Sequence, residues 1–435
     1  MSILTNPVLV SVVALVVLCL GKINVLLALI ISALLAGMLS GMSLLKCMGI
    51  LVNGMGGNSE TALSYILLGV LAAAMANTGI TEILSNKIEK VVKGRKVLLL
   101  VILALVACCS QNVIPVHIAF IPILIPPLLS MMNDMQLDRR AVACSLAFGL
   151  KAPYISLPFG FGLIFQGLVA KHMESNGVFL ATSDVWKGTW PLGVSMILGL
   201  LVGWFIFRNN RTYKNLPIPG QQARRVRQEK MLLVHWLTLF AAFIVLAINL
   251  STGSLPLGAL AGIVVMVIGG AIKLDDFDAI VNDGVCIMGF IGFVMLVAAG
   301  YSEVIKATGG VNQLVEASVS IAGDSKIMAA VMMMLIGLVV TIGIGSSFST
   351  IPVIATLFVP VCARMGFTPL GCAMLIAAAA ALGDAGSPAS DTTLGPTAGL
   401  NADGQHNHIW DTCVPTGILY NMPLAICAII LAPFM

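Results

Sequence analysis

The chain has 435 residues, 59% of them hydrophobic and only 10% charged, with a formal net charge of +4 at pH 7. Soluble domains carry about 25% charged residues, so this chain has too little charge to form a water-facing surface. The composition therefore predicts a membrane protein whose main partner is the lipid bilayer, and the lack of a basic stretch interleaved with aromatic residues argues against nucleic-acid binding.

Apolar segments suited to helices follow one another along the chain. They are expected at about 7–20, 24–41, 62–77, 141–157 and 190–207 in the first half, and at about 231–250, 255–272, 285–301, 369–383 and 412–433 in the second. The first segment has the apolar content of a signal peptide. It lacks a preceding Lys or Arg and a following A-x-A site, however, which favours a retained helix.

Two longer apolar stretches, 97–131 and 327–361, exceed the ~20 residues of a single span. Polar residues and a proline interrupt each of them near its middle. These two stretches are therefore expected to be broken rather than continuous helices.

Short patterns recur between the two halves in the same order, with offsets that cluster near 230 residues. The matched pairs are Asn77-Thr78-Gly79 with Ala307-Thr308-Gly309, Gly54 with Gly284, Ser110–Pro115 with Ser347–Pro352, Cys144 with Cys372, Ser156–Pro158 with Gly386–Pro388, and Trp186-Pro191-Gly193 with Trp410-Pro415-Gly417. Because one match is noise but an ordered series is not, the chain is expected to contain a duplicated unit. The predicted organisation is a first transmembrane repeat over 1–208, a basic cytoplasmic linker over 209–230, and a second transmembrane repeat over 231–435.

Basic residues predict the orientation, because Lys and Arg favour the cytoplasmic side. The clusters at 87–96, 139–140 and 208–230 can all be cytoplasmic only if 97–131 enters and leaves on one side, as a re-entrant hairpin. Each half then has about five spans, an odd number, which turns the second repeat upside down. Its hairpin, 327–361, dips from outside, and both termini are external.

The predicted fold class is therefore an all-α polytopic membrane protein. It consists of two inverted repeats, each with about five transmembrane helices and one re-entrant hairpin, in the inner (cytoplasmic) membrane. Inverted repeats with discontinuous helices are typical of secondary transporters, whose binding site lies near the middle of the bilayer.

Both hairpin tips carry side-chain oxygens. Irregular backbone at membrane depth is tolerated only inside protein or beside a water-filled cavity, so the tips are expected to line one. Hard cations take oxygen ligands, and the candidates at the tips are Ser110, Gln111, Asn112, Ser347, Ser349 and Thr350. The alternative is that these residues cap their own helices.

The segment 382–397 is the richest in polar groups, and Pro388 and Pro396 break helical hydrogen bonding within it. Acids inside transmembrane segments are costly and point to ion pathways or proton relays. The cation-binding candidates in this segment are Asp384, Ser387, Ser390, Asp391 and Thr392. The alternative is an ordinary loop at the membrane surface, which is the interpretation given to Asp403 and Asp411.

The equivalent segment of the first half contains a lysine among apolar residues. Lys151 is expected to neutralise an acid such as Asp384 or to hold a substrate carboxylate, unless its ammonium snorkels to the surface. His117 titrates near neutral pH when unperturbed, and a packing role is an equal alternative. The candidate substrate-binding residues are His117, Lys151, Tyr154, Ser156 and Thr356.

The run Gly383-Asp384-x-x-Ser387-Pro388-x-Ser390-Asp391-Thr392-Thr393 resembles the G-D-x-x-S-P-x-S-D-T-T pattern of the NhaC-type Na+/H+ antiporter family. The tips at Ser110–Pro115 and Ser347–Pro352 resemble the paired hairpin motifs of the wider ion transporter superfamily. The resemblance implies Na+ coordination at both tips and handling of H+ or Na+ by Asp384 and Asp391. It leaves the substrate open, because this group also includes organic-anion exchangers and candidate amino-acid permeases.

Taken with the residues, the resemblance predicts an NhaC-like Na+/H+ antiporter that works by alternating access. Na+- or H+-coupled uptake of an amino acid or small carboxylate is the alternative, and it accounts for Lys151, His117 and Tyr154. An ion channel is less favoured, because channels are usually cyclic oligomers with the pore on the axis. An enzyme is not expected, because no catalytic Ser/His or H-E-x-x-H pattern occurs.

The remaining composition argues against bound groups other than the transported ions. The ten cysteines are scattered without a C-x-x-C pair, and no His lies at metal-ligand spacing. Neither a disulfide framework, a transition-metal site nor a cofactor is expected. The oligomeric state is left open, with a homodimer as one option.

Overall fold

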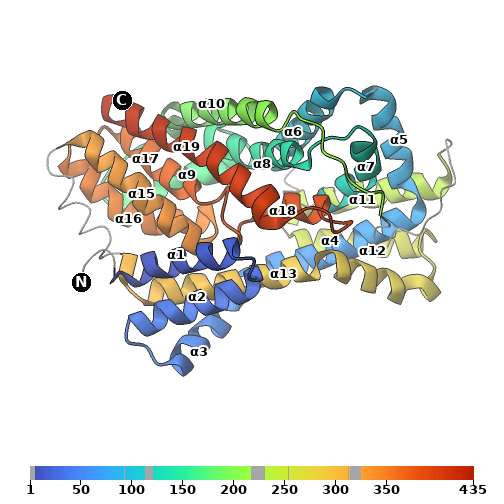
Figure 1. Cartoon of the computed structure of the whole chain (residues 1–435), viewed down its shortest axis with the longest axis horizontal. Helices are drawn as coiled ribbons and strands as arrows, with labels where there is room; N and C mark the ends of the chain where they lie inside the picture. The colour runs from blue at the N-terminus through green and yellow to red at the C-terminus, as the bar shows by residue number, and fades with distance from the viewer. Residues whose placement is uncertain are drawn as a thin grey trace.

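The computed structural model describes residues 5–92, 94–112, 121–216, 231–252, 254–311, 313 and 325–435. Within these ranges every regular element is a helix, which confirms the all-α prediction (Figure 1). The first half contains α1 (Pro7–Leu20), α2 (Val25–Leu39), α3 (Leu44–Gly54), η2 (Met55–Asn58), α4 (Ser59–Thr78), α5 (Ile80–Val92), α6 (Lys96–Asn112), α7 (Ile121–Asp134), α8 (Arg139–Ser156), α9 (Phe161–Ser175) and α10 (Thr182–Ile206).

The second half repeats this order with local differences. It contains α11 (Leu233–Thr252), α12 (Leu255–Ile268), η4 (Leu274–Asp276), α13 (Phe277–Ala307), α15 (Lys326–Ile344), α16 (Ser347–Arg364), α17 (Pro369–Leu382), α18 (Asp391–Leu400), the π-helix η5 (His408–Cys413), α19 (Val414–Leu431) and η6 (Ala432–Phe434). Helices α3, α5, α9 and α18 lie outside the spans expected from the sequence.

The helices have the length and surface of membrane spans. Among the described residues, five helical segments are long and apolar enough to cross a bilayer, or six if α8 and α9, bent by 48°, count as one span. Large apolar side chains face outward, with exposed fractions of 86% at Leu45, 85% at Leu233 and 82% at Ile268. Water would disfavour such a surface, whereas lipid accepts it. The chain is a polytopic membrane protein.

Two long helices, α4 of the first half and α13 of the second, cross at the centre of the molecule (Figure 1). Small residues allow the close approach, as they do between membrane helices in general. A Cβ atom added to Gly54 would lie 3.0 Å from Gly300 Cα, one added to Gly292 would lie 3.2 Å from Ala62 O, and one added to Gly284 would lie 2.3 Å from Val70 N. As the numbering rises along α3–η2–α4, the partner number falls along α13, so the two segments are antiparallel.

The offset of 230 residues relates these contacts to one another. It converts the contact of Gly54 with Gly300 into the contact of Gly284 with Val70, and it converts Ala62 into its own partner, Gly292. A pseudo-two-fold axis therefore passes between Ala62 and Gly292. Because the equivalent helices run antiparallel, this axis is perpendicular to them, which is the geometry of an inverted repeat.

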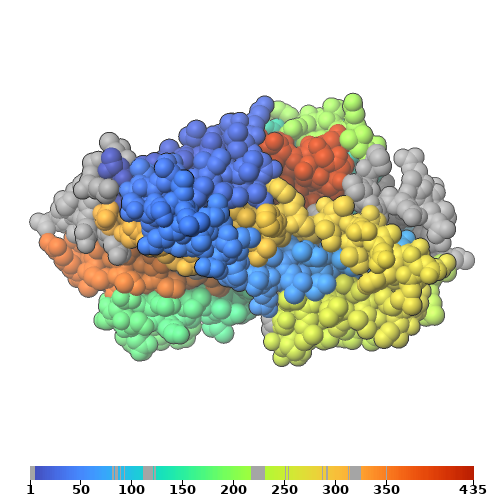
Figure 2. All heavy atoms as spheres, turned by 90° about the horizontal axis from the view of Figure 1, so that it is seen from below, coloured from blue at the N-terminus to red at the C-terminus, as the bar shows by residue number. Residues whose placement is uncertain are grey.

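The first helix of each half meets the end of the other half's long helix. Asn6 Nδ2 donates to Gly310 O at 2.7 Å, and His235 Nε2 bonds Thr78 O at 3.0 Å. The two long helices also end alike, each followed by a left-handed glycine, Gly79 (φ 80°) or Gly309 (φ 65°). Figure 2 shows α1–α3 in blue and α11–α12 in yellow-green to yellow on either side of the central crossing.

The second long apolar stretch is interrupted, as the sequence predicts. Helices α15 and α16 lie side by side and meet at Gly345, a left-handed residue (φ 74°), and Ser346 (Figure 1). In the first half, α6 and α7 flank residues 113–120, which lie outside the described residues. The side from which each hairpin enters the membrane stays a prediction.

Candidate ion-binding site

Each half contains a helix that breaks at the same repeat position. Helix α8 ends at Ser156 and α9 begins at Phe161, while α17 ends at Leu382 and α18 begins at Asp391. Pro158 and Pro388 lie within the two breaks. Unwound backbone among packed membrane helices needs polar partners from the protein.

The second break supplies much of its own hydrogen bonding. Thr393 Oγ1 donates to Ser387 O at 2.6 Å, and Ser390 caps α18 by accepting from Thr392 N at 3.3 Å. Ser387 Oγ accepts from Ala389 N at 3.3 Å. These bonds fix the shape of the break, so capping describes part of what Ser387 and Ser390 do.

Asp384 lies at the centre of the polar cluster, with only 7% of its surface exposed. Tyr154 donates to Oδ2 at 2.9 Å, Ser390 Oγ donates to Oδ1, and Thr392 Oγ1 donates to the Asp384 carbonyl at 3.0 Å. The Tyr154 hydroxyl also lies 2.8 Å from Ser347 Oγ at the second hairpin tip. Side chains from α8, α16, α18 and the break therefore gather around Asp384, and two of them, Tyr154 and Ser390, bond its carboxyl group directly.

Tyr154 and Asp384 are themselves 230 residues apart, the offset of the prolines in the two breaks. A residue that contacts its own repeat equivalent lies on the pseudo-two-fold axis. The contact therefore lies where the two halves of the chain meet. The sequence predicts both residues as site members but not their direct contact.

Aromatic packing holds the second hairpin tip against the first repeat. The ring of Phe348 lies 5.6 Å from Tyr154, 5.7 Å from Phe161 and 5.5 Å from Phe165, between ring centroids. Tilted and edge-on pairs at these distances are favourable. Sequence reasoning missed these phenylalanines, because an apolar ring in an apolar segment carries no signal of its contact.

Asp391 occupies a different environment, in the first turn of α18. Its Oδ1 accepts a hydrogen bond from the Tyr65 hydroxyl at 3.2 Å. Carboxylates at helix N-termini are favoured by the helix dipole, so a structural role accounts for this acid. Tyr65, on α4, connects the break to the central crossing and was not among the predicted residues.

Lys151 is fully buried, so the snorkelling interpretation is wrong. Its Nζ donates to Asn421 Oδ1 at 3.1 Å, and Asn421 Nδ2 donates in turn to Ala385 O at 2.8 Å. Within the described ranges no carboxylate lies at ion-pair distance from this ammonium.

The other predicted residues are placed less centrally. Ser110, Ser156, Thr350 and Thr356 each donate to a carbonyl of their own helix or turn, at 2.9, 2.6, 2.6 and 2.8 Å respectively. Thr356 is exposed and is not brought to Asp384. Gln111, Asn112 and Ser349 lie in helices, but their side chains, like the whole of His117, are outside the described part of the chain.

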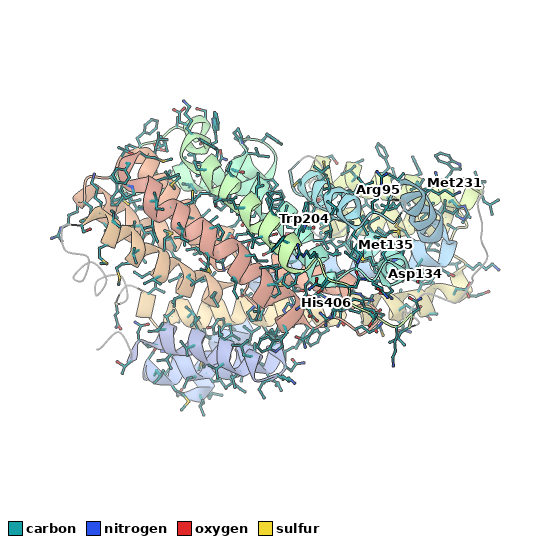
Figure 3. All side chains as sticks on the ribbon, turned by 45° about the horizontal axis from the view of Figure 1, so that its top comes forward. Arg95, Asp134, Met135, Trp204, Met231 and His406 are labelled. Carbon is teal, nitrogen blue, oxygen red and sulfur yellow. The ribbon has the colours of Figure 1, made fainter. Side chains whose placement is uncertain are left out.

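Asp403 and Asp411 are not surface-loop acids, which corrects the expectation from the sequence. Both are buried, and they pair with Arg139 at 2.6 Å and with Arg211 at 2.8 Å respectively. These arginines belong to two of the basic clusters predicted to be cytoplasmic. Figure 3 shows His406, next to this network, on the same side of the molecule as Arg95 and Asp134.

The fold and the buried polar site define a membrane transporter, and the comparisons name its family. Residues 145–432 match the Na+/H+ antiporter family, and residues 6–92 match a second Na+-H+ antiporter family. The chain belongs to the Na+/H+ antiporter family, which transports Na+ and H+ and is not a family of enzymes.

Full-length relatives are similar to this chain. The Bacillus subtilis protein named "Putative amino acid transporter YuiF" is 45% identical over 86% of this chain and 87% of its own. An uncharacterized membrane protein of Vibrio parahaemolyticus, VP2115, is 46% identical over 97% of this chain and 98% of its own. Among solved structures, the YdaH transporter of Alcanivorax borkumensis is 12% identical with a TM-score of 0.42, over 88% of this chain and 86% of that one.

Proposed function

We propose that this protein exchanges Na+ for H+ across the membrane by alternating access, with Asp384 as the carboxylate that both ions share. The observation that carries the proposal is the environment of Asp384: it is buried, its side-chain partners are hydroxyl groups, and no Lys or Arg of the described residues lies at ion-pair distance. A buried carboxylate without an ion-pair partner is strongly disfavoured, so we infer that the group holds a proton or a metal cation.

The two occupants exclude each other on chemical grounds. When Asp384 is protonated, it is a neutral group that can form hydrogen bonds with the surrounding hydroxyls, so its burial needs no counter-charge. Ionised Asp384 offers a hard cation an oxygen ligand, and Ser347, Tyr154 and Ser390 offer neutral oxygens beside it. Entry of Na+ therefore requires departure of the proton, and this competition at one site is the basis of exchange.

The two-fold relation of the repeats supports the alternating-access part of the proposal. The site lies where the repeats meet, so rocking of one repeat against the other would open it to either side in turn. We further propose the orientation derived from the basic clusters: hairpin 97–131 enters from the cytoplasm and hairpin 327–361 from outside. The termini are then external, the linker 209–230 is cytoplasmic, and the membrane is the inner one.

Reconstituted vesicles test this function directly. With the purified protein in vesicles loaded with a pH-sensitive dye, an inward Na+ gradient should raise the internal pH as protons leave in exchange. A K+ gradient of the same size controls for leak. Absence of a Na+-dependent pH change in vesicles shown to contain the folded protein would rule the exchange out.

Lys151 favours a second candidate, Na+-coupled uptake of an amino acid or small carboxylate. A buried ammonium held only by an amide lacks a counter-anion, and a substrate carboxylate would provide one. The name of the Bacillus relative points the same way. In this alternative Asp384 would bind the coupling Na+, and Asn421 would release Lys151 to the substrate.

Lys151→Met, which keeps the length of the side chain and removes its charge, separates the two candidates. If Lys151 binds substrate, the variant should lose stabilisation by amino acids or carboxylates yet keep stabilisation by Na+. If Lys151 balances Asp384, the variant should unfold at a lower temperature, and adding Asp384→Asn should restore part of the loss. Thermal unfolding of the purified variants with and without ligands is the measurement. A variant unchanged in every respect contradicts both roles.

A further inference from the structure

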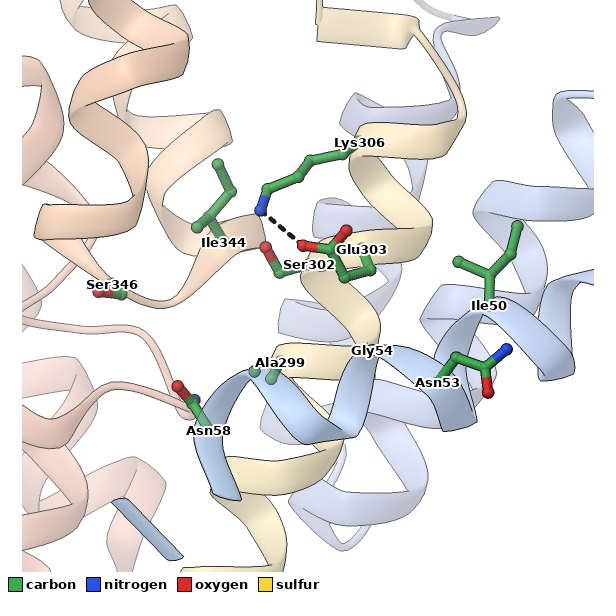
Figure 4. A pocket seen from close by; sticks show the side chains of 11 residues that line it. Ile50, Asn53, Gly54, Asn58, Ala299, Ser302, Glu303, Lys306, Ile344 and Ser346 are labelled. Carbon is green, nitrogen blue, oxygen red and sulfur yellow. Dashed lines mark hydrogen bonds and ion pairs between the residues drawn. The ribbon is translucent and has the colours of Figure 1, made fainter. Parts of the chain in front are cut away.

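A polar pocket of about 520 Å³ lies on one side of the central crossing (Figure 4). Its walls are α3 with η2, the C-terminal part of α13, and the break between α15 and α16. The polar lining residues are Asn53, Asn58, Ser302, Glu303, Lys306 and Ser346. Such a lining in a largely apolar protein is suited to water and dissolved ions, and the pocket is too wide to replace the hydration shell of a small cation.

The pocket ends next to the Asp384 site. Its lining includes Ser346, and the following residue, Ser347, lies 2.8 Å from the Tyr154 hydroxyl that donates to Asp384. One residue of the hairpin break thus separates the pocket from the cluster around the buried carboxyl group.

The ion pair of this pocket has no charged equivalent at the other end of the crossing within the described residues. The offset of 230 places Ala73 and Ala76 where the second repeat has Glu303 and Lys306, and Ala73 is buried. Met288 takes the position of Asn58, is only 1% exposed, and packs against Gly69. Among the described residues, therefore, Glu303 and Lys306 have only alanines at the equivalent positions of the first repeat, although Asp283 takes the position of Asn53.

Glu303 and Lys306 form an ion pair of 2.6 Å on consecutive turns of α13, within the pocket lining (Figure 4). Their side chains are 47% and 39% exposed, and exposed pairs of this kind contribute little to folding. An arriving cation can therefore replace the Lys306 ammonium beside the carboxylate at little cost to the fold. Until then the ammonium balances the carboxylate, so the pair carries no net charge.

We propose that this pocket is the water-filled entrance to the Asp384 site from one side of the membrane, and that Glu303 attracts monovalent cations into it while Lys306 limits the attraction. The proposal rests on the proposed exchange of Na+ at Asp384. It assigns a selectivity role to two residues of α13 that the ion-binding cluster does not include. With the orientation derived from the basic clusters, this side is the external one.

The charge of the pocket can be tested without transport. Asn53→Cys places a thiol in the pocket lining, and its labelling by membrane-impermeant cationic and anionic thiol reagents is compared with that of the parent protein, to subtract the native cysteines. Labelling should occur from one side only. Adding Glu303→Gln should lower the cationic-to-anionic rate ratio by about threefold to tenfold, and Lys306→Gln should raise it.

The connection to Asp384 needs the exchange assay. Glu303→Gln should raise the KM for Na+ by a similar factor from the labelled side only, with little change in kcat, and added choline chloride should shrink the difference by screening. Asp278→Asn, the same charge change at the other end of α13, is the matched control. A cationic-to-anionic labelling ratio that is the same with and without Glu303→Gln and Lys306→Gln would overturn the inference. A KM change from both sides would overturn it too. If the wild-type protein shows no exchange at all, the proposed function is refuted instead. The labelling experiment then still decides whether the pocket attracts cations.

Discussion

Asp384→Asn is expected to abolish Na+-driven proton movement while leaving the protein folded. The amide keeps the shape: its oxygen can accept from one of the hydroxyls of Tyr154 and Ser390 while its NH2 donates to the other, but it can neither ionise nor release a proton. Breaking a buried charge pair costs about 3–5 kcal/mol, and about 3 kcal/mol corresponds to roughly a hundredfold loss in Na+ affinity. The measurement is the Na+-dependent pH change in reconstituted vesicles.

Thermal unfolding in detergent checks that binding rather than folding is lost. Na+ should raise the unfolding temperature of the wild-type protein and leave that of Asp384→Asn unchanged. Asp275→Asn, which changes an exposed acid, should behave like the wild type in both assays. Retention of Na+ stabilisation in Asp384→Asn would move the cation site elsewhere, with the N-terminus of α18 at Asp391 the next position to test.

The repeat architecture could be predicted from the sequence because close packing constrains residue type. Gly54 and Gly284 match across the repeat, and the structure places both where a side chain would collide with the opposite helix. The turn after each long helix needs a left-handed glycine, which marks Gly79 and Gly309. Positions where only glycine fits leave a repeat in the sequence, even after the surrounding apolar residues have diverged.

The breaks and their acids could also be predicted, because prolines and carboxylates are conspicuous in an apolar chain. The partners could not, since tertiary packing determines them. Nothing near Asp384 in the sequence points to Tyr154, and nothing near Asp391 points to Tyr65. Helices α9 and α18 were missed because each begins just after a proline-containing break and reads as part of an irregular segment.

Asp403 shows the same limit at the predicted cytoplasmic end. Beside Gly404, Gln405 and His406 it reads as a loop residue. Its oxygens instead accept from both terminal nitrogens of Arg139, at 2.7 and 2.6 Å, and Arg139 also donates to Leu400 O at 2.8 Å. The pairing ties the start of α8 to the end of α18, the two helices that flank the ion site.

Asp403→Asn is therefore expected to destabilise the protein by about 3–5 kcal/mol at neutral pH, because it leaves the Arg139 guanidinium buried without a counter-charge. The side chains of the pair are 0% and 2% exposed, so water cannot replace the lost carboxylate. The double variant Arg139→Met with Asp403→Asn should recover part of the loss. Asp184→Asn breaks the pair with Lys187, in which the lysine side chain is 55% exposed and the aspartate side chain 40%. This change should cost less than about 1 kcal/mol.

The cost of Asp403→Asn should also depend on pH in a defined direction. Burial raises the pKa of Asp403, but the hydrogen bonds and the charge of Arg139 lower this pKa by a larger amount. The pKa in the folded protein therefore lies below the ordinary value of 3.8. A carboxyl group with a lowered pKa stabilises the fold fully above its unfolded pKa and loses that contribution as the pH falls through its folded pKa. The difference in unfolding free energy between wild type and Asp403→Asn should thus be constant from pH 8 to about pH 5 and should shrink below about pH 4. Chemical unfolding in detergent at several pH values measures it, and a difference that grows on acidification would contradict the assignment of the pair.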